Sequence, residues 1–489
     1  MPGDLPTDQF RSAMHRVADL VADYLEGVGD RPVVPAVSPG DVRRVLPVAP
    51  PEEPEPVETI LDDYLRVIEP NLTHWNHPGF FAYFAITGSG PGILGETLAA
   101  ALNINAMLWR TSPAATELEE RVCEWLARMM ELPPELRGHI NDTASSSSLV
   151  ALAAARHRLP ELEVRAKGLS GRPVPGLTVY ASDQAHSSID KAAIVLGVGQ
   201  ENVRRVATDE EFRLSVPALA AAIARDRAEG RLPMAVVATA GTTSTTSVDP
   251  IPEIADLCAR EGIWLHVDTA YAGAAAICPE YRQRMPGLER ADSLVVNPHK
   301  WLFTPVDCSV LFVRDPALLK DAFSLVPEYL RTDDGEVTNL MDNGFQLGRR
   351  FRSLKLWMVI RAFGVEGLRE RIREHCALAR ELAERLAADP RFELAAPVPF
   401  STVCFRACAA GPPEEQDRFN ERLLARLNAA GPVFLSHTVL RGRYTLRVAI
   451  GNLRTERAHV EGLWHLLVRS LEELQAEVAR STSPPDPLS

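Results

Sequence analysis

Lys300 is the residue whose surroundings most clearly favour chemistry. It follows the apolar run Ser293–Val296 and lies between His299 and Trp301. Most lysines are solvated surface charges, but partial desolvation at the end of a buried strand lowers the pKa of the amine. An amine in that state can form a Schiff base with a carbonyl compound.

Asp268 holds the equivalent position after a second apolar run, residues 263–267. Its carboxylate could simply cap a helix, or it could keep the nitrogen of a pyridine ring protonated so that the ring withdraws electrons. A lysine Schiff base and an acidic residue on the ring nitrogen are the pair of groups that pyridoxal phosphate uses. Lys300 and Asp268 at the ends of neighbouring strands therefore predict a pyridoxal-phosphate site.

Small hydroxyl residues at the start of a predicted helix could bind the phosphate. Residues 142–156 read D-T-A-S-S-S-S-L-V-A-L-A-A-A-R, and free backbone N–H groups, serine hydroxyls and the helix dipole together suit an anion. A serine-rich helix start without a ligand is an equally open interpretation. His186 follows another apolar run, and its ring could stack on a flat cofactor or serve only as a hydrogen-bond donor.

The elements that position these residues are short apolar runs alternating with helical stretches. Four of the five runs lead into polar, reactive residues, which is typical of a mostly parallel sheet covered by helices. Ligands bind beyond the carboxyl ends of such strands, so the loops should converge on one pocket. The predicted strands are residues 177–181, 234–238, 263–267, 293–296 and 309–313.

The flanking sequence predicts an arm before this sheet and a smaller domain after it. Residues 8–26 have the periodicity of an amphipathic helix, and the proline-rich residues 32–56 are typical of an extended connector. After residue 366, predicted strands at 401–405, 433–435 and 444–450 alternate with helices, as in an α+β domain. We expect an arm at 1–85, a large domain at 86–365, a small domain at 366–478 and a disordered tail at 479–489.

Composition excludes several other classes of protein. The 489 residues are 46% hydrophobic, and 52 basic against 65 acidic residues give a net charge of −13 with the two signs interspersed, which argues against nucleic-acid binding. No apolar run is long enough for a membrane span, and no signal peptide is recognisable. Seven scattered cysteines indicate reduced thiols. We therefore expect a cytoplasmic protein without a membrane partner.

One glycine motif imitates a dinucleotide site. Gly90, Gly92 and Gly95 satisfy G-x-G-x-x-G, but Pro91 occupies the tight turn. The acidic residues about twenty positions later lie in a helical stretch, not at a strand end. The context therefore argues against a nicotinamide cofactor, and no H-E-x-x-H or other ligand spacing indicates a metal.

Several long motifs resemble those of the group II pyridoxal-phosphate decarboxylases, of the aromatic-L-amino-acid decarboxylase type. They are N-P-H-K-W, D-Q-A-H-S-S, H-V-D-T-A-Y-A-G and L-G-R-R-F-R-S-L-K-L-W. The likeness begins at the N-terminal helix and ends at L-R-V-A-I near the C-terminus. It implies the α/β architecture of fold-type I, aminotransferase-like enzymes. It also implies a homodimer with the active site at the subunit interface and the N-terminal arm clasping the partner.

The resemblance implies roles for single residues. Lys300 is similar to the Schiff-base lysine, Asp268 to the partner of the pyridinium nitrogen and Ala270 to the small residue beneath the ring. His186 resembles the histidine that stacks on the ring, and His299 adjoins the lysine. Four further residues resemble contacts to the cofactor: Ala144, Ser145, Thr243 and Asn297.

Tyr329, in L-V-P-E-Y-L-R-T-D-D-G, matches a loop tyrosine that protonates the substrate carbon after carbon dioxide leaves. A phenol with a pKa of about 10 stays protonated at neutral pH and can donate that proton. A tight ion pair to the departing carboxylate would stabilise the ground state, where the charge is still localised. We therefore assign Arg447 no role as a carboxylate ligand.

The departures from the animal aromatic enzymes lie in the substrate pocket. Ala85 and Ile86 replace a Pro-Thr pair, and Val306 replaces a phenylalanine. Asn105 and Met107 replace an isoleucine and a phenylalanine that the partner subunit supplies. An aromatic wall is kept by Trp75, Tyr83 and Phe84.

We expect a pyridoxal-phosphate decarboxylase that converts an L-amino acid to its amine and carbon dioxide. The substrate class is tryptophan, tyrosine, dihydroxyphenylalanine or phenylalanine. The alternatives are an aromatic aldehyde synthase, which adds oxidative deamination and has phenylalanine at the loop tyrosine, and a decarboxylase of a non-aromatic amino acid. A non-catalytic dimer with the same fold is a further alternative. Tyr329 argues against the synthase, and the intact set of Lys300, Asp268 and His186 argues against the non-catalytic dimer.

Overall fold

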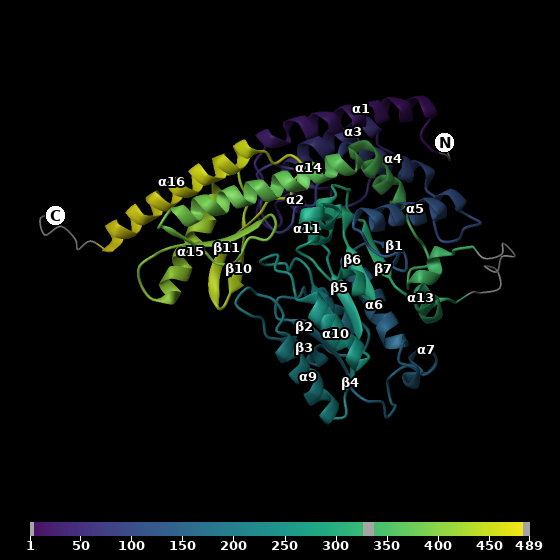
Figure 1. Ribbon diagram of the computed structural model, residues 1–489. Coiled ribbons are helices and arrows are strands. Elements are labelled where there is room, and N and C mark those ends of the chain that lie inside the picture. The colour runs from purple at the N-terminus through teal and green to yellow at the C-terminus, as the bar shows by residue number, and fades with distance from the viewer. Residues whose placement is uncertain (1–3, 326–336, 483–489) are drawn as a thin grey trace, which may run out of the picture.

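A seven-stranded sheet forms the centre of the large domain in this computed structural model, which describes residues 4–325 and 337–482 (Figure 1). The strand order is β1-β7-β6-β5-β4-β2-β3. Neighbours from β3 to β6 are parallel, whereas β7 is antiparallel to both β6 and β1. The strands are β1 (Arg137–Asn141), β2 (Leu177–Ser182), β3 (Val203–Val206), β4 (Leu232–Thr239), β5 (Trp264–Asp268), β6 (Ser293–Val296) and β7 (Ser309–Val313).

Helices cover both faces of this sheet, so its central strands are buried on both sides. Every residue of β2, β5, β6 and β7 is buried, which is why these strands appear in the sequence as continuous apolar runs. The mostly parallel sheet and all five predicted strands are confirmed. The helices are α4 (Gly90–Leu102), α5 (Pro113–Met129), α6 (Ala144–His157), α7 (Val164–Lys167), α8 (Ser188–Val195), α9 (Val216–Ala228), α10 (Ile251–Glu261), α11 (Pro279–Arg282), α12 (Pro298–Trp301) and α13 (Pro316–Phe323).

A second, antiparallel sheet with the order β10-β11-β9-β8 forms the small α+β domain, as predicted. The long helix α14 leads into it and contains one non-helical residue, Gly364, close to the predicted domain limit at 365. The strand predicted near 433–435 is present but begins one residue past that range, at residue 436. The elements are α14 (Arg352–Ala388), β8 (Phe392–Leu394), β9 (Thr402–Ala407), α15 (Pro413–Ala429), β10 (Ser436–Leu440), β11 (Arg443–Ala449) and α16 (Arg457–Thr482).

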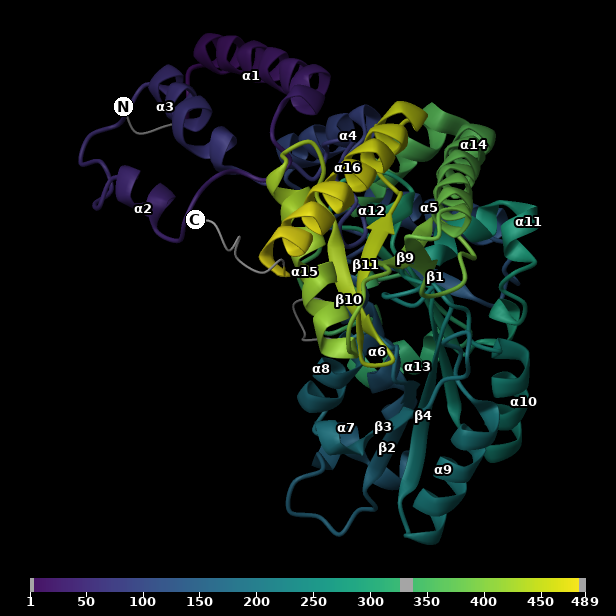
Figure 2. The ribbon, with the colours of Figure 1, turned by 90° about the vertical axis from the view of Figure 1, so that its left-hand side faces the viewer.

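The first helices stand to one side of the rest of the chain, as Figure 2 shows. They are α1 (Thr7–Gly27), α2 (Asp41–Val45) and α3 (Val57–Asp63). In α1 only Ala13 is buried, so its apolar stripe has little to pack against within this chain. The proline-rich connector is not extended throughout, because α2 lies within it. At the other end, α16 continues to Thr482, four residues past the predicted limit of the small domain at 478.

The G-x-G-x-x-G motif lies in α4 and serves helix packing. A Cβ on Gly95 would lie 2.6 Å from the Cα of Lys355 in α14, and a Cβ on Gly92 would lie 2.2 Å from Pro305. These glycines let α4 approach its neighbours closely.

Two further features concern the described part of the chain. None of its helices combines the length and the apolar composition needed to cross a bilayer. All seven cysteines are unpaired, and Cys408 is the exposed one among them.

Candidate active site

A cavity of about 180 Å³ lies beyond the carboxyl ends of the parallel strands. It contains every residue predicted to bind the cofactor, together with the predicted catalytic residues other than Tyr329. Tyr329 lies outside the described residues. The walls are formed by Phe84, Thr143, Ala144, Ser145, His186, Thr239, Gly241, Thr243, Asp268, Ala270, Tyr271, Asn297, His299 and Lys300.

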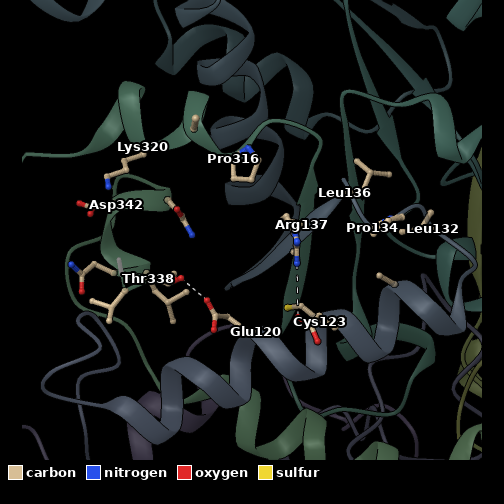
Figure 3. Close-up of a pocket in the computed structure, with 18 of the residues that line it drawn as sticks. Glu120, Cys123, Leu132, Pro134, Leu136, Arg137, Pro316, Lys320, Thr338 and Asp342 are labelled. Atoms are coloured by element: carbon tan, nitrogen blue, oxygen red, sulfur yellow. Dashed lines mark hydrogen bonds and ion pairs between the residues drawn. The ribbon is translucent and has the colours of Figure 1, made fainter. Parts of the chain in front are cut away.

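A larger cavity of about 890 Å³ lies elsewhere, between α5, β1, α13 and residues 337–343 (Figure 3). There Thr338 donates a 2.5 Å hydrogen bond to Glu120. Its walls contain none of the residues predicted to bind the cofactor. Side-chain chemistry, and not cavity size, therefore identifies the smaller cavity as the candidate active site.

Lys300 stands on the short helix α12, directly after β6. Its backbone N–H donates to the carbonyl of Asn297 at 3.0 Å, which fixes the turn that presents the amine to the cavity. Burial lowers the pKa of this amine below its ordinary value, the charge of Asp268 opposes the shift, and Arg447 adds to it. A lowered pKa leaves more of the amine neutral and nucleophilic near neutral pH.

Asp268 ends β5, between β4 and β6, so its place in the cavity is set by the register of three strands. One carboxylate oxygen, Oδ1, accepts the backbone N–H of Ala270 at 2.9 Å. The other oxygen has no hydrogen-bond partner among the described residues. The carboxylate is therefore held in orientation with one oxygen available to a ligand.

His186 is held as a neutral ring. Its Nδ1 accepts the backbone N–H of Ser188 at 3.1 Å, so the ring proton belongs on Nε2. Burial lowers the pKa of this imidazole, with an opposing effect from Asp268. Burial also lowers the pKa of His299 to about 3, and its Nδ1 accepts the N–H of Cys308 at 2.9 Å. Both histidines are uncharged at neutral pH.

The start of α6 forms the end of the cavity that suits an anion. Ser147 and Ser148 are directed into the core, where Ser147 bonds Asn141 at 3.2 Å and Ser148 approaches His266 at 3.2 Å. Ser145 instead lines the cavity. The serine run therefore divides between structural hydrogen bonds and the cavity wall, a division that the sequence left open.

The cavity contains polar atoms that the described residues leave unsatisfied. Oδ1 of Asn297 and Oγ1 of Thr239 are buried without a hydrogen-bond partner. Buried polar atoms are almost always paired, so a polar ligand would account for both. Pyridoxal phosphate fits this donor set, because the cavity combines an amine, a fixed carboxylate, a neutral imidazole and a helix start.

A column of stacked rings supports one wall of the cavity. Phe84 stacks on Tyr271 with ring centroids 3.7 Å apart, and Tyr271 stacks on Trp301 at 4.6 Å. Trp301 donates its indole N–H to His375 of α14 at 2.9 Å. The column connects the cavity to α14 and fixes the position of Phe84.

The predicted substrate pocket is only partly assembled within one chain. Phe84 lines the cavity, while Trp75 stacks on Tyr83 at 5.9 Å beside it. Asn105 accepts the backbone N–H of Arg349 at 2.8 Å, and Met107 packs near Met341. Six of the seven predicted pocket residues are absent from the cavity wall of the described chain: Trp75, Tyr83, Ile86, Asn105, Met107 and Val306.

Four wall residues were not singled out from the sequence: Thr143, Thr239, Gly241 and Tyr271. Thr239 and Gly241 belong to the T-A-G-T-T-S stretch at the end of β4. Their position at a strand end is the one signal in the sequence that could have indicated a place in the cavity wall. A Cβ on Gly241, which has φ +93°, would lie 2.4 Å from the Cβ of Ala272. This close approach of Gly241 to Ala272 depends on tertiary packing, which the composition does not reveal.

Comparison with known proteins points to the same cofactor. Residues 39–408 match the family described as the pyridoxal-dependent decarboxylase conserved domain. The chain is 42% identical to tryptophan decarboxylase 2 of Oryza sativa subsp. japonica, covering 95% of this chain and 94% of that protein. It is 42% identical to tyrosine decarboxylase 2 of Arabidopsis thaliana, covering 95% and 87%. It is 41% identical to phenylacetaldehyde synthase of Arabidopsis thaliana, covering 95% and 96%.

Solved structures agree with the sequence relatives. Oryza sativa TDC with PLP and tryptamine superposes with a TM-score of 0.93 at 39% identity, covering 97% of this chain and 100% of that chain. Catharanthus roseus tryptophan decarboxylase in complex with L-tryptophan superposes with a TM-score of 0.90 at 38% identity, covering 96% and 100%. The likeness extends over both domains and the arm.

Proposed function

This chain belongs to the pyridoxal-dependent decarboxylase family, and we propose that within it the chain decarboxylates an aromatic L-amino acid to the corresponding amine. The observation that supports this best is one cavity holding Lys300, Asp268 and His186 beside the Phe84–Tyr271 stack. The fold is the α/β fold-type I architecture, and the cofactor is pyridoxal phosphate. The amino acids named for the relatives are aromatic.

The cavity residues would hold the cofactor through complementary groups. Lys300 would attach it, Asp268 would pair with the ring nitrogen, and His186 would stack against the ring. The start of α6, with Ala144 and Ser145, would receive the phosphate. When bound, pyridoxal phosphate supplies a cationic ring that accepts the electron pair released as carbon dioxide leaves.

The residues of the chain control the protons and the orientation. The Lys300 amine, whose pKa burial lowers, would hold the cofactor and can carry a proton at its nitrogen. Asp268 would keep a proton on the ring nitrogen through its carboxylate, which the Ala270 N–H fixes. The neutral His186 contributes a flat surface without adding a second charge to the site.

Selection of the bond that breaks depends on orientation. The residues of the cavity would have to hold the substrate carboxylate in the one orientation from which carbon dioxide can leave. Less polar surroundings for the carboxylate raise the ground-state energy relative to the transition state. The aromatic and small residues of this cavity, Phe84, Ala270 and Tyr271, provide such surroundings.

The aromatic wall leads to a prediction about substrate class. We expect kcat/KM for tryptophan, tyrosine, dihydroxyphenylalanine or phenylalanine to exceed that for leucine or valine by about 10²-fold, because a large ring buries more apolar area against Phe84 and Tyr83. Carbon dioxide release measured across these amino acids and histidine tests it. Equal or faster turnover of an aliphatic acid would favour the non-aromatic alternative.

Product analysis tests the aldehyde-synthase alternative, which the 41% identity to a phenylacetaldehyde synthase supports. That reaction consumes one O₂ and one water per amino acid and yields aldehyde, CO₂, NH₃ and H₂O₂. Because Tyr329 provides a proton donor for the substrate carbon, we expect amine without peroxide from the natural chain. We expect Tyr329→Phe to divert product to aldehyde and peroxide. Stoichiometric peroxide from the unaltered chain would contradict the decarboxylase assignment.

We also propose a homodimer with the active site at the subunit interface and a cytoplasmic location. The support is apolar surface that this chain leaves uncovered: Leu94, Leu98 and Leu102 on α4 are 59%, 52% and 59% exposed at four-residue spacing. Asn105 and Met107 are outside this chain's cavity wall, as expected of residues that would serve a partner's site. A sedimentation mass near the 53.6 kDa of one chain would contradict the dimer.

The proposed cytoplasmic location is supported by the scattered free thiols, which are typical of a reducing compartment. Fractionation of the native cells tests this location.

A further inference from the structure

Arg447 reaches out of the small-domain sheet and contacts the active-site walls. It lies on β11 and is 3% exposed. Its Nε donates to the carbonyl of Ser244 at 3.0 Å, and its Nη1 donates to the carbonyl of Tyr83. The guanidinium carbon lies 4.5 Å from the centroid of the Phe84 ring. One side chain therefore connects the aromatic wall (Trp75, Tyr83 and Phe84) to the cofactor loop (residues 241–247).

Three strands of the small domain meet at Ser244 of the cofactor loop. Besides Arg447 from β11, Cys404 of β9 donates its thiol to the same carbonyl at 3.2 Å. Thr438 of β10 lies 2.9 Å from the Ser244 hydroxyl. Ser244 directly follows Thr243, which lines the cavity. The small domain thus fixes the loop that carries a predicted cofactor contact.

The Tyr83 peptide is held on both sides by cross-strand neighbours of the small sheet. Arg447 pairs with Ser436 in the register of β10 and β11. The Ser436 hydroxyl accepts the Tyr83 N–H at 3.2 Å, while Nη1 of Arg447 donates to the Tyr83 carbonyl. Tyr83 has φ +52°, a left-handed conformation that a tyrosine adopts only where its surroundings impose it. These two hydrogen bonds supply that constraint, and the next residue is Phe84.

Arg447 is also a buried positive charge without a carboxylate. No ion pair to it is present among the described residues, and its Nη2 is buried without a hydrogen-bond partner. A buried charge without a counter-ion is costly to folding, which indicates a function at this position. The amine of Lys300 lies 5.4 Å from the same Phe84 ring. The Arg447 charge lowers the pKa of Lys300.

We propose that Arg447 is a positioning residue for the decarboxylation: it fixes the Tyr83–Phe84 peptide relative to the cofactor loop and holds a permanent positive charge at the Phe84 ring, which the Lys300 amine also approaches. This inference rests on the proposed function for its kinetic effects only. Because Nε and Nη1 of Arg447 each donate to a backbone carbonyl, we place its action in these carbonyls and in its charge.

Two variants separate the positioning effect from the charge effect. Arg447→Lys keeps the charge but cannot reach both carbonyls, whereas Arg447→Met removes both. We expect either variant to lower kcat/KM by about 10²-fold, because misplacement of a wall by about 1 Å has effects of that size. Arg443→Met is the matched control. It alters the same strand, and Arg443 contacts Glu393 and Gln416, neither of which lies in the cavity wall.

The charge effect is measured on the cofactor-free chain. The rate of Lys300 acylation against pH, read by peptide mass spectrometry, gives the pKa of the amine. The charged groups that act on this amine are Asp268 and Arg447, and the histidines that face it are His186 and His299. Both histidines are neutral near pH 7, so Asp268 and Arg447 dominate. Arg447→Met should raise the Lys300 pKa and slow acylation at a given pH, while Arg447→Lys should leave it near the natural value.

Several outcomes would overturn the proposal. They are an unchanged Lys300 profile in Arg447→Met, an unchanged kcat/KM in Arg447→Lys, or equal losses in Arg443→Met. If Arg447→Met does not fold, Ser436→Ala removes only the acceptor of the Tyr83 N–H. It should raise KM several-fold with little change in the Lys300 profile, and no change in KM would contradict the positioning role. Absence of decarboxylation in the unaltered chain would refute the proposed function while leaving the Lys300 profile as a separate test.

Discussion

Replacing Lys300 with alanine is expected to lower kcat by about 10²- to 10⁴-fold, the range that a positioned proton-transfer group contributes. The same amine would also attach the cofactor, so borohydride reduction of the natural holoenzyme should leave the label on Lys300. Burial lowers the pKa of this amine, which keeps it able to react near neutral pH. Steady-state kinetics measures the loss of kcat. Peptide mapping of the borohydride-reduced protein locates the label.

The control for Lys300 is a lysine with no contact to the cavity. Lys167, which forms a surface ion pair with Glu163 at 2.5 Å, is about half exposed. Lys167→Ala should retain full turnover and labelling, since exposed ion pairs contribute little. Added methylamine should restore part of the activity of Lys300→Ala by supplying an external amine. Label on another lysine, or near-normal turnover of Lys300→Ala, would refute the assignment.

Replacing Asp268 with asparagine is expected to lower kcat by about 10²- to 10³-fold, as is typical when one preorganised electrostatic group is lost from a reacting site. The amide can occupy the same space and can still accept from Ala270, whose N–H lies 2.9 Å from Oδ1. It cannot keep a pyridine nitrogen protonated. We therefore expect nearly unchanged folding, weaker cofactor binding and a large loss in kcat. Stopped-flow turnover and cofactor titration measure these separately.

Asp268→Glu is the informative companion variant. It keeps the charge but moves the carboxylate by one methylene group, so it should recover part of the rate if charge is the main contribution. A full rate in Asp268→Asn would show that the ring nitrogen needs no acid. Equal losses in the asparagine and glutamate variants would instead indicate that position outweighs charge.

Much of the large domain could be predicted because its central strands are buried on both faces. Burial on both sides demands continuous apolar residues, and such runs are visible in the sequence. The strands β1 and β3 were missed because they lie at the sheet edges and contain Arg137, His139, Arg204 and Arg205. These polar side chains find partners through tertiary contacts, such as the ion pair of Arg204 with Asp226 at 2.8 Å. No local pattern reveals those partners.

The cofactor site was predictable because its residues each follow a strand, and parallel strands deliver their carboxyl ends to one edge. By itself the sequence therefore determined the chemistry: an amine, a carboxylate and an imidazole brought to one cavity. Which of the serines after Thr143 face that cavity, why Gly95 is a glycine and what Arg447 touches were decided only by the tertiary structure. The physical reason is that these roles depend on contacts between segments far apart in the chain, and periodicity reports only the neighbours of each residue along one element.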